Sequence, residues 1–200
     1  MMEAELRSAE VGGLYVTYRE AGVGTPLVLL HGFLCDSRCW MPQLSGVSDR
    51  FRVVAWDAPG AGASSDPPDA FTTTEYARCL AGFLDTITVG RAHVVGLSWG
   101  GILAQEFYRM YPDRLRSLIL ADTYAGWKGS LPEPVWKERL VSCLRDATGP
   151  AEAVVAEPLH AAIPGAELAI IPNAGHLSNM EQPDAFNAHV RRFCLQSDAA

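Results

Sequence analysis

A serine flanked by glycines is the feature of this sequence best suited to chemistry. Ser98 stands in the segment Gly-Leu-Ser-Trp-Gly at 96–100, between the apolar run His-Val-Val at 93–95 and a helical pattern. This arrangement is typical of a nucleophile elbow, in which a tight, strained turn lifts the serine hydroxyl out of the sheet. The N-terminus of the next helix favours negative charge at the same place. Ser98 is therefore the candidate nucleophile, and the alternative is an ordinary Gly-Ser turn.

His176 is the candidate general base. It ends the segment Asn-Ala-Gly-His at 173–176, just after the apolar run 168–171. Because loops at the carboxyl ends of parallel strands converge on one crevice, this histidine is placed to take the Ser98 proton. The alternative is a histidine that caps the final helix. The other histidines are expected to be structural or at the surface: His31, His93, His160 and His189.

Two backbone N–H groups are candidates for an oxyanion hole. Phe33 follows the apolar run 27–30 in the segment His-Gly-Phe, and Trp99 follows the candidate nucleophile. Amides at these two places can donate to the same developing oxyanion. We also expect the side chains of Phe33, Trp99 and Tyr124 to contact the substrate, although aromatic residues near such a turn are as often part of the core.

The elements that position these residues follow from the apolar pattern. Alternation in about residues 3–11 and in 14–20 predicts an antiparallel hairpin that turns at Gly12-Gly13. Continuous apolar runs farther on are typical of mostly parallel strands that helices cover on both faces. The strands predicted in this way are 27–30, 53–56, 93–96, 118–121 and 168–171. The predicted helices are 36–46, 74–87, 99–111 and one beginning near Gln182-Pro183.

The interval 122–165 breaks this alternation because it holds no β-rich run. Apolar residues at helical spacing predict an amphipathic helix at 134–147. A second helix is predicted at 150–163, ending at Pro164-Gly165. We therefore expect one α/β domain over residues 1–200, with 123–149 as a reduced cap or lid insertion.

Composition excludes several classes of partner. The 200-residue chain has 16 Lys and Arg against 23 Asp and Glu, a formal net charge of −7 that disfavours binding to nucleic acid. No apolar run approaches the ~20 residues of a membrane span, and the first residues lack the pattern of a signal peptide. The 5 cysteines show no CxxC spacing and favour free thiols in a reducing compartment. We expect a soluble, cytoplasmic protein with no metal, no dinucleotide and no other cofactor.

Four segments stand in a fixed order along most of the chain: Leu-His-Gly-Phe at 30–33, Trp-Asp-Ala-Pro-Gly-Ala-Gly-Ala-Ser at 56–64, Gly-Leu-Ser-Trp-Gly-Gly at 96–101 and Asn-Ala-Gly-His at 173–176. Together they resemble the landmarks of the α/β-hydrolase superfamily, and within it the esterases, enol-lactonases and acyl-homoserine lactonases. The resemblance implies an α/β-hydrolase fold with Ser98 as nucleophile and His176 as base. It also implies an oxyanion hole from the amides of Phe33 and Trp99, and a structural role for Asp57.

The sequence departs from that superfamily where the acid of the triad normally lies, because the strand and loop that carry it are missing, as is most of the cap. Asp122, at the end of the predicted strand 118–121, is the first candidate to orient His176, and its alternative is a turn cap. Asp146 is the second candidate. Without the missing strand, 168–171 is expected to pair directly with 118–121. Otherwise a neighbouring chain could supply it, giving a homodimer that covers the sheet edge or the pocket.

The expected activity is hydrolysis of a small carboxylic ester or lactone through an acyl-enzyme on Ser98. In proteins of the resembled fold, dehalogenases and epoxide hydrolases carry aspartate at the elbow, so serine disfavours those reactions. The alternative is a hydrolase-like protein that binds a small ligand with impaired or no turnover, because the usual acid is missing. A third interpretation is perhydrolase chemistry, in which peroxide replaces water.

Overall fold

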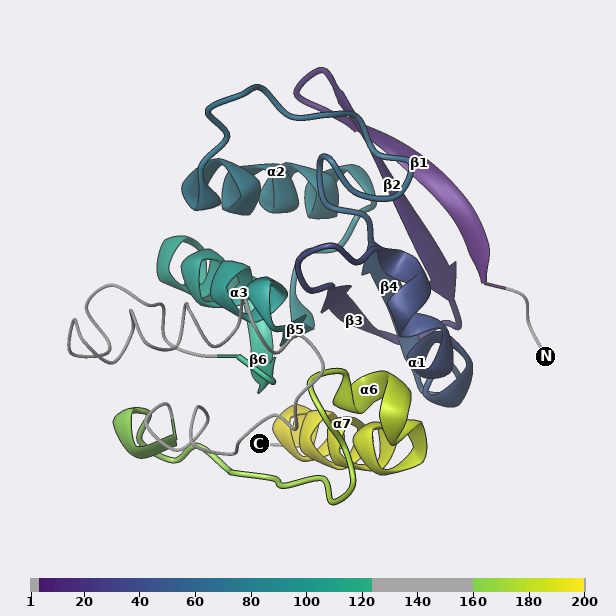
Figure 1. Ribbon diagram of the computed structural model, residues 1–200, viewed down its shortest axis with the longest axis vertical. Helices are drawn as coiled ribbons and strands as arrows, with labels where there is room; N and C mark the ends of the chain where they lie inside the picture. The colour runs from purple at the N-terminus through teal and green to yellow at the C-terminus, as the bar shows by residue number, and fades with distance from the viewer. Residues whose placement is uncertain (1–3, 124–159, 200) are drawn as a thin grey trace.

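The computed structural model describes residues 4–123 and 160–199, which form an α/β structure around a six-stranded sheet (Figure 1). Its strands are β1 (Glu5–Val11), β2 (Leu14–Ala21), β3 (Thr25–Leu30), β4 (Phe51–Trp56), β5 (Ala92–Leu97) and β6 (Leu115–Ala121). The spatial order is β1-β2-β4-β3-β5-β6. β2 pairs antiparallel with β1 and β4, and all the other pairs are parallel. The predicted mostly parallel sheet with an N-terminal antiparallel hairpin is confirmed.

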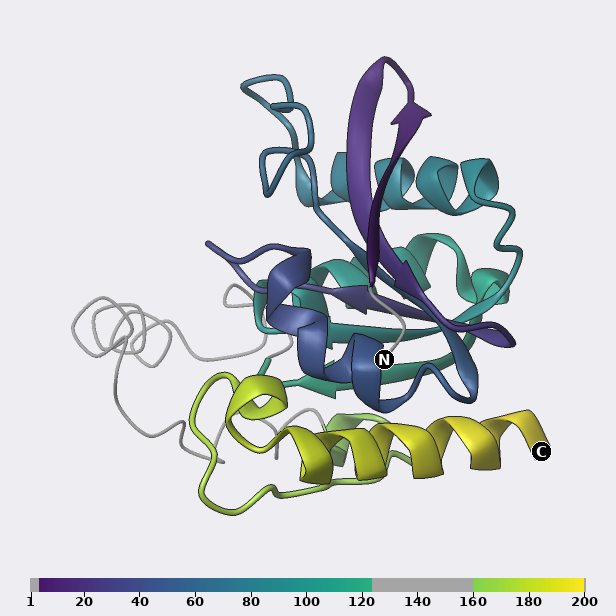
Figure 2. The same ribbon diagram turned by 90° about the vertical axis from the view of Figure 1, so that its right-hand side faces the viewer.

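Helices cover both faces of this sheet (Figures 1 and 2). They are the 3-10 helices η1 (Ser37–Trp40) and η2 (Pro112–Arg114) and the α-helices α1 (Met41–Gly46), α2 (Thr73–Thr86), α3 (Trp99–Met110), α6 (Ser178–Glu181) and α7 (Pro183–Ala199). Val28 of β3 packs with Phe107 of α3, whereas its neighbour Leu29 packs with Trp40 and Phe186 on the opposite face. Because successive side chains of a strand point to opposite faces, two covered faces require the continuous apolar run that the sequence contains.

Local sequence signals set the ends of several elements. Gly12 and Gly13 have φ angles of 57° and 86° in the turn of the hairpin, a conformation that costs glycine little. Thr72 and Glu75 form a capping box at the start of α2. Pro112 follows the end of α3. The predicted helix 36–46 is divided into η1 and α1.

The predicted strand 168–171 is wrong. This segment has no strand structure, it does not pair with β6, and Leu168 and Ile170 are 41% and 66% exposed. Glu167, which precedes it, forms an ion pair with Arg192 of α7 at 2.8 Å. A strand needs a neighbour to receive its backbone hydrogen bonds, and an apolar run alone does not provide one. Within the described residues β6 is thus the last strand of the sheet, and pairing with a second chain remains a prediction.

Some expectations fall outside the described residues. These are the helix at 134–147, the start of the helix at 150–163, and most of the cap at 123–149; residues 160–162 are helical and precede the turn at Pro164-Gly165, as predicted. The described cysteines Cys35, Cys39, Cys79 and Cys194 are free thiols. No helix in the described segments is long and apolar enough to cross a membrane.

Candidate active site

Ser98 occupies a strained turn between β5 and α3. Its φ and ψ are 54° and −117°, which a non-glycine residue rarely adopts. Two glycines make the turn possible: a Cβ on Gly96 would lie 2.4 Å from the carbonyl oxygen of Gly100, and one on Gly100 would lie 2.2 Å from that of Leu30. The chain can therefore turn sharply here only without these side chains, and the turn leaves Ser98 half-buried just after the carboxyl end of β5.

The structure brings His176 to Ser98. Nε2 of the imidazole lies 3.0 Å from Oγ of Ser98, although 78 residues separate them in the sequence. The loop that carries His176 leads into α6, and the buried amide of Asn179 in α6 donates to the carbonyl of Cys39 at 2.8 Å. The 3.0 Å between Nε2 of His176 and Oγ of Ser98 suits direct proton transfer from a serine to a histidine base.

Asp122 lies next to this pair but does not hydrogen-bond to His176. Its Oδ2 accepts from the hydroxyl and the backbone N–H of Ser178, at 2.6 Å and 3.3 Å. Burial raises the pKa of the Asp122 carboxyl, whereas the bonds to Ser178 and the nearby charge of His176 lower it. Asp122 is thus close enough to influence the imidazole by its charge. The other candidate acid, Asp146, lies outside the described residues.

The two candidate oxyanion donors come from two different segments, the start of α3 and the loop after β3. Trp99 is the first residue of α3, and its half-buried ring meets Tyr76 edge-on at a centroid distance of 5.1 Å. The loop after β3 passes close to the nucleophile, because a Cβ on Gly32 would lie 3.3 Å from Cβ of Ser98. The next residue, Phe33, has a side chain that is 74% exposed. Tyr124, the third expected contact, lies outside the described residues.

His31 and Asp57 hold the loops beneath this site. Nδ1 of His31 lies 2.8 Å from the carbonyl oxygen of Gly32, and Nε2 accepts from the N–H of Ala58 at 3.0 Å. These partners require a neutral imidazole with its proton on Nδ1. The carboxylate of Asp57, which follows β4, accepts from the N–H of Ser37 at the start of η1 at 2.6 Å. Both residues are in the structural positions that the sequence indicates.

Stability is expected to fall in mild acid. Burial lowers the pKa of His31 and of the fully buried His93, so the folded state binds fewer protons than the unfolded chain as the pH falls below about 6.5. The free energy of unfolding should therefore decrease from pH 7 to pH 5, by at most about 1.4 kcal/mol per pH unit for each histidine. Denaturant unfolding at both pH values checks this. His31→Gln should reduce the difference, and His160→Gln, at an exposed site, should leave it unchanged; an equal effect of both would contradict the assignment.

Glu181 lies beside His176 and is not among the site residues predicted from the sequence. Its carboxylate accepts from the N–H of Gly175 at 2.7 Å and from that of Leu177 at 3.0 Å, on either side of His176. Ser178, the partner of Asp122, is not among the predicted residues either. The available signal was a carboxylate five residues after the candidate base, but that spacing becomes meaningful only because α6 is a single turn that folds back on its own entry loop.

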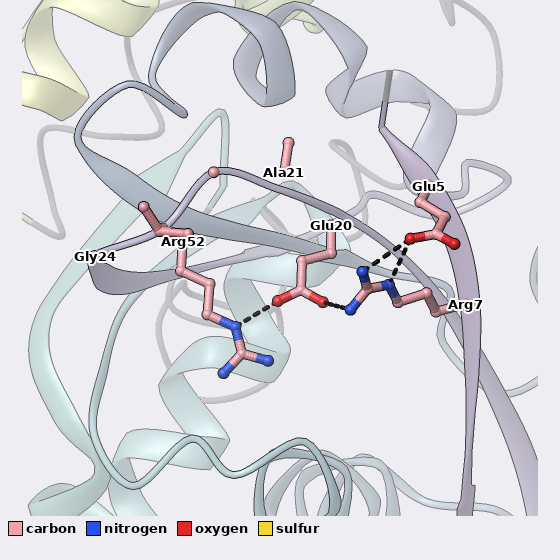
Figure 3. A pocket seen from close by; sticks show the side chains of 8 residues that line it. Glu5, Arg7, Glu20, Ala21, Gly24 and Arg52 are labelled. Carbon is pink, nitrogen blue, oxygen red and sulfur yellow. Dashed lines mark hydrogen bonds and ion pairs between the residues drawn. The ribbon is translucent and has the colours of Figure 1, made fainter. Parts of the chain in front are cut away.

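A separate open pocket of 460 Å³ lies at the other end of the parallel strands, beside the start of β4. Figure 3 shows Glu20 between Arg7 and Arg52, and both guanidinium groups pair with its carboxylate. Glu5 also pairs with Arg7 at 2.8 Å. Since these charges satisfy one another and Ser98 is at the opposite edge, we assign no chemistry to this pocket. No described group of three or more His, Cys, Asp and Glu side chains could hold a metal ion.

Comparison with known proteins gives a consistent result. A family model described as the alpha/beta hydrolase fold matches residues 25–141. The poly(3-hydroxyalkanoate) depolymerase of Ectopseudomonas oleovorans is 37% identical over 102 residues, which are 51% of this chain and 36% of that protein. The 2-(acetamidomethylene)succinate hydrolase of Mesorhizobium japonicum is 32% identical over 116 residues, 58% of this chain and 42% of that protein. The chain thus spans less than half the length of these relatives.

A solved structure supports the same fold. The enol-lactonase from Burkholderia xenovorans LB400 superposes with a TM-score of 0.78 and covers 94% of this chain and 99% of its own. The two sequences are 23% identical, so this similarity concerns the fold alone.

Proposed function

Because this chain belongs to the α/β-hydrolase fold family, we propose that it hydrolyses a small carboxylic ester or lactone, with Ser98 as nucleophile and His176 as general base. The observation that carries the proposal is the 3.0 Å approach of His176 Nε2 to Ser98 Oγ on a strained strand-to-helix turn. A nucleophile within hydrogen-bond reach of a base is the arrangement that acyl transfer requires.

In the proposed reaction, Oγ of Ser98 attacks the substrate carbonyl while Nε2 of His176 takes its proton. The N–H groups of Phe33 and Trp99 donate to the oxyanion of the tetrahedral intermediate. His176 returns the proton to the leaving alcohol, and an acyl-enzyme remains on Ser98. Water then attacks the acyl group by the same route, with His176 again as base.

Asp122 is the proposed acid, acting by its charge and through Ser178 rather than by a direct hydrogen bond. A carboxylate near the imidazole stabilises the imidazolium that forms when His176 takes the proton. Since the bond to Nδ1 is missing among the described residues, we assign Asp122 a smaller share of catalysis than the acid of a direct triad.

Two exposed apolar side chains in the loop next to Ser98 support a substrate with an apolar group. Phe33 and Leu34 are 74% and 92% exposed, directly after the glycine that borders Ser98. Leu34 also has a φ of 60°, an uncommon conformation that would be better suited to glycine or asparagine. A carbonyl oxygen at the Phe33 amide would bring its acyl or alkyl group against these side chains.

Turnover of short aryl esters and simple lactones tests this function. We expect measurable hydrolysis by the wild type and a decrease of kcat by about 10- to 100-fold in Asp122→Asn, against about 10⁴-fold for the acid of a direct triad. Asp113→Asn, which removes the same charge at an exposed position, is the matched control and should behave as the wild type.

The competing function is a small-ligand-binding protein with impaired turnover. One observation favours it: the carboxylate of Asp122 is directed to Ser178 instead of His176. If the wild type hydrolyses no ester or lactone of the panel, with or without peroxide, this alternative replaces the proposal.

A further inference from the structure

The orientation of His176 depends on its backbone, because its side chain has little other support. The residue is exposed, and among residues 4–123 and 160–199 its only hydrogen bond is the one from Nε2 to Ser98. A base whose second ring nitrogen has no fixed partner loses control of tautomer and orientation. If the Ser98–His176 pair is to act, another group in the chain must therefore fix the orientation of the imidazole.

Glu181 is the group that fixes the backbone on both sides of His176. One carboxylate oxygen accepts from Gly175 N–H at 2.7 Å, and the other accepts from Leu177 N–H at 3.0 Å. A single side chain thus holds the N–H groups of the residues before and after His176. Because Gly175 and Leu177 are both bonded to one carboxylate, the short segment that carries His176 has few backbone conformations, and this limits the directions that its Cα–Cβ bond can take.

The turn α6, which carries Glu181, is itself anchored to the core. Glu181 ends α6, and the fully buried Asn179 in the same turn donates to the carbonyl of Cys39 at 2.8 Å. The backbone oxygen of Asn179 accepts in turn from the buried amide of Gln43 at 2.9 Å. These bonds tie α6 to η1 and α1. Because α6 is held in this way, the bonds from Glu181 hold the exposed loop of His176 in a fixed place relative to the core.

We propose that Glu181 is a positioning residue for the general base, which it orients by accepting the N–H groups of Gly175 and Leu177. The role rests on the proposed function, because it has meaning only if His176 takes the proton of Ser98. Glu181 does not touch the reacting atoms. Its loss should therefore slow proton transfer while leaving substrate binding almost unchanged.

The test compares Glu181→Gln with Glu181→Asp. The glutamine amide has the same shape but one acceptor oxygen, so it loses one of the two backbone bonds. Aspartate keeps the charge but is one methylene shorter and cannot span both N–H groups as well. Glu167→Gln is the matched control, since it removes the same charge from an exposed glutamate that pairs only with Arg192 among the described residues.

Two rates are measured for each variant: hydrolysis of an aryl ester, and inactivation by a fluorophosphonate. In the second reaction Oγ of Ser98 forms a bond to phosphorus, fluoride leaves with the electron pair of the P–F bond, and His176 takes the serine proton. Thermal unfolding shows that the rates refer to folded protein. This readout needs no knowledge of the natural substrate.

We expect Glu181→Gln to lower kcat and the inactivation rate by about 10- to 100-fold, with KM within about twofold of wild type. Both rates of Glu181→Asp should lie between those of Glu181→Gln and the wild type, and both rates of Glu167→Gln should match the wild type. If the wild type reacts and folded Glu181→Gln reacts equally fast, the positioning role is overturned while the proposed function stands. A wild type that neither turns over esters nor reacts with the fluorophosphonate overturns both.

Discussion

Ser98→Ala is expected to lower kcat on an aryl ester by at least about 10⁴-fold. The substitution removes the hydroxyl proposed to attack the carbonyl, so that only substrate binding and the proposed oxyanion donors remain. The fold should persist, because among the described residues the Ser98 hydroxyl bonds only to the exposed His176, at 3.0 Å. Steady-state kinetics together with denaturant unfolding measure the two effects separately.

His176→Ala should cost about as much as Ser98→Ala, and the double variant should be little slower than either single one. The proposed nucleophile and base act as one unit, so removing the second lowers kcat little further once the first is gone. Ser45→Ala is the matched control, because Ser45 is exposed and, in the part of the chain that the structure describes, its hydroxyl bonds only to backbone carbonyls within α1. Ser98→Ala with more than a hundredth of the wild-type kcat would show that another group is the nucleophile.

The sequence allowed the central part of the site to be predicted because short-range physics determines it. Gly96, two residues before Ser98, is required because any Cβ there would lie 2.4 Å from the carbonyl oxygen of Gly100, four residues later. The apolar runs of β3 and β5 reflect two covered faces of one sheet. Such constraints act within a few residues or on one repeating pattern, so they are visible in a single sequence.

The remaining features depend on contacts between distant segments. The apolar run 168–171 resembles a strand, but its state depends on whether a partner strand lies beside it. The place of Asp122 after a strand makes it a candidate acid, but its hydrogen-bond partner in the structure is Ser178, 56 residues later. Glu181 is near His176 in sequence, but its bonds depend on a turn that Asn179 ties to Cys39, 140 residues away. No local spacing rule encodes these choices.

Gly100→Ala should be among the most destabilising substitutions in the chain. A Cβ at this position would lie 2.2 Å from the carbonyl oxygen of Leu30, 2.6 Å from that of His31 and 2.7 Å from the carbonyl carbon of Leu30. All three atoms are backbone, so no side chain can rotate away. Alanine normally favours a helix over glycine by up to about 1 kcal/mol, and this clash must reverse that preference.

We expect Gly100→Ala to lower the free energy of unfolding by about 3 kcal/mol or more, as measured by denaturant unfolding. Gly90→Ala is the matched control, because its Cβ would meet nothing within 4 Å. The strain should also reach the site, since the displaced carbonyls of Leu30 and His31 precede the proposed oxyanion donor Phe33. The folded fraction should therefore have a lower kcat as well. A Gly100→Ala variant within about 0.5 kcal/mol of wild type would mean that the strand β3 and the elbow are not in contact as described.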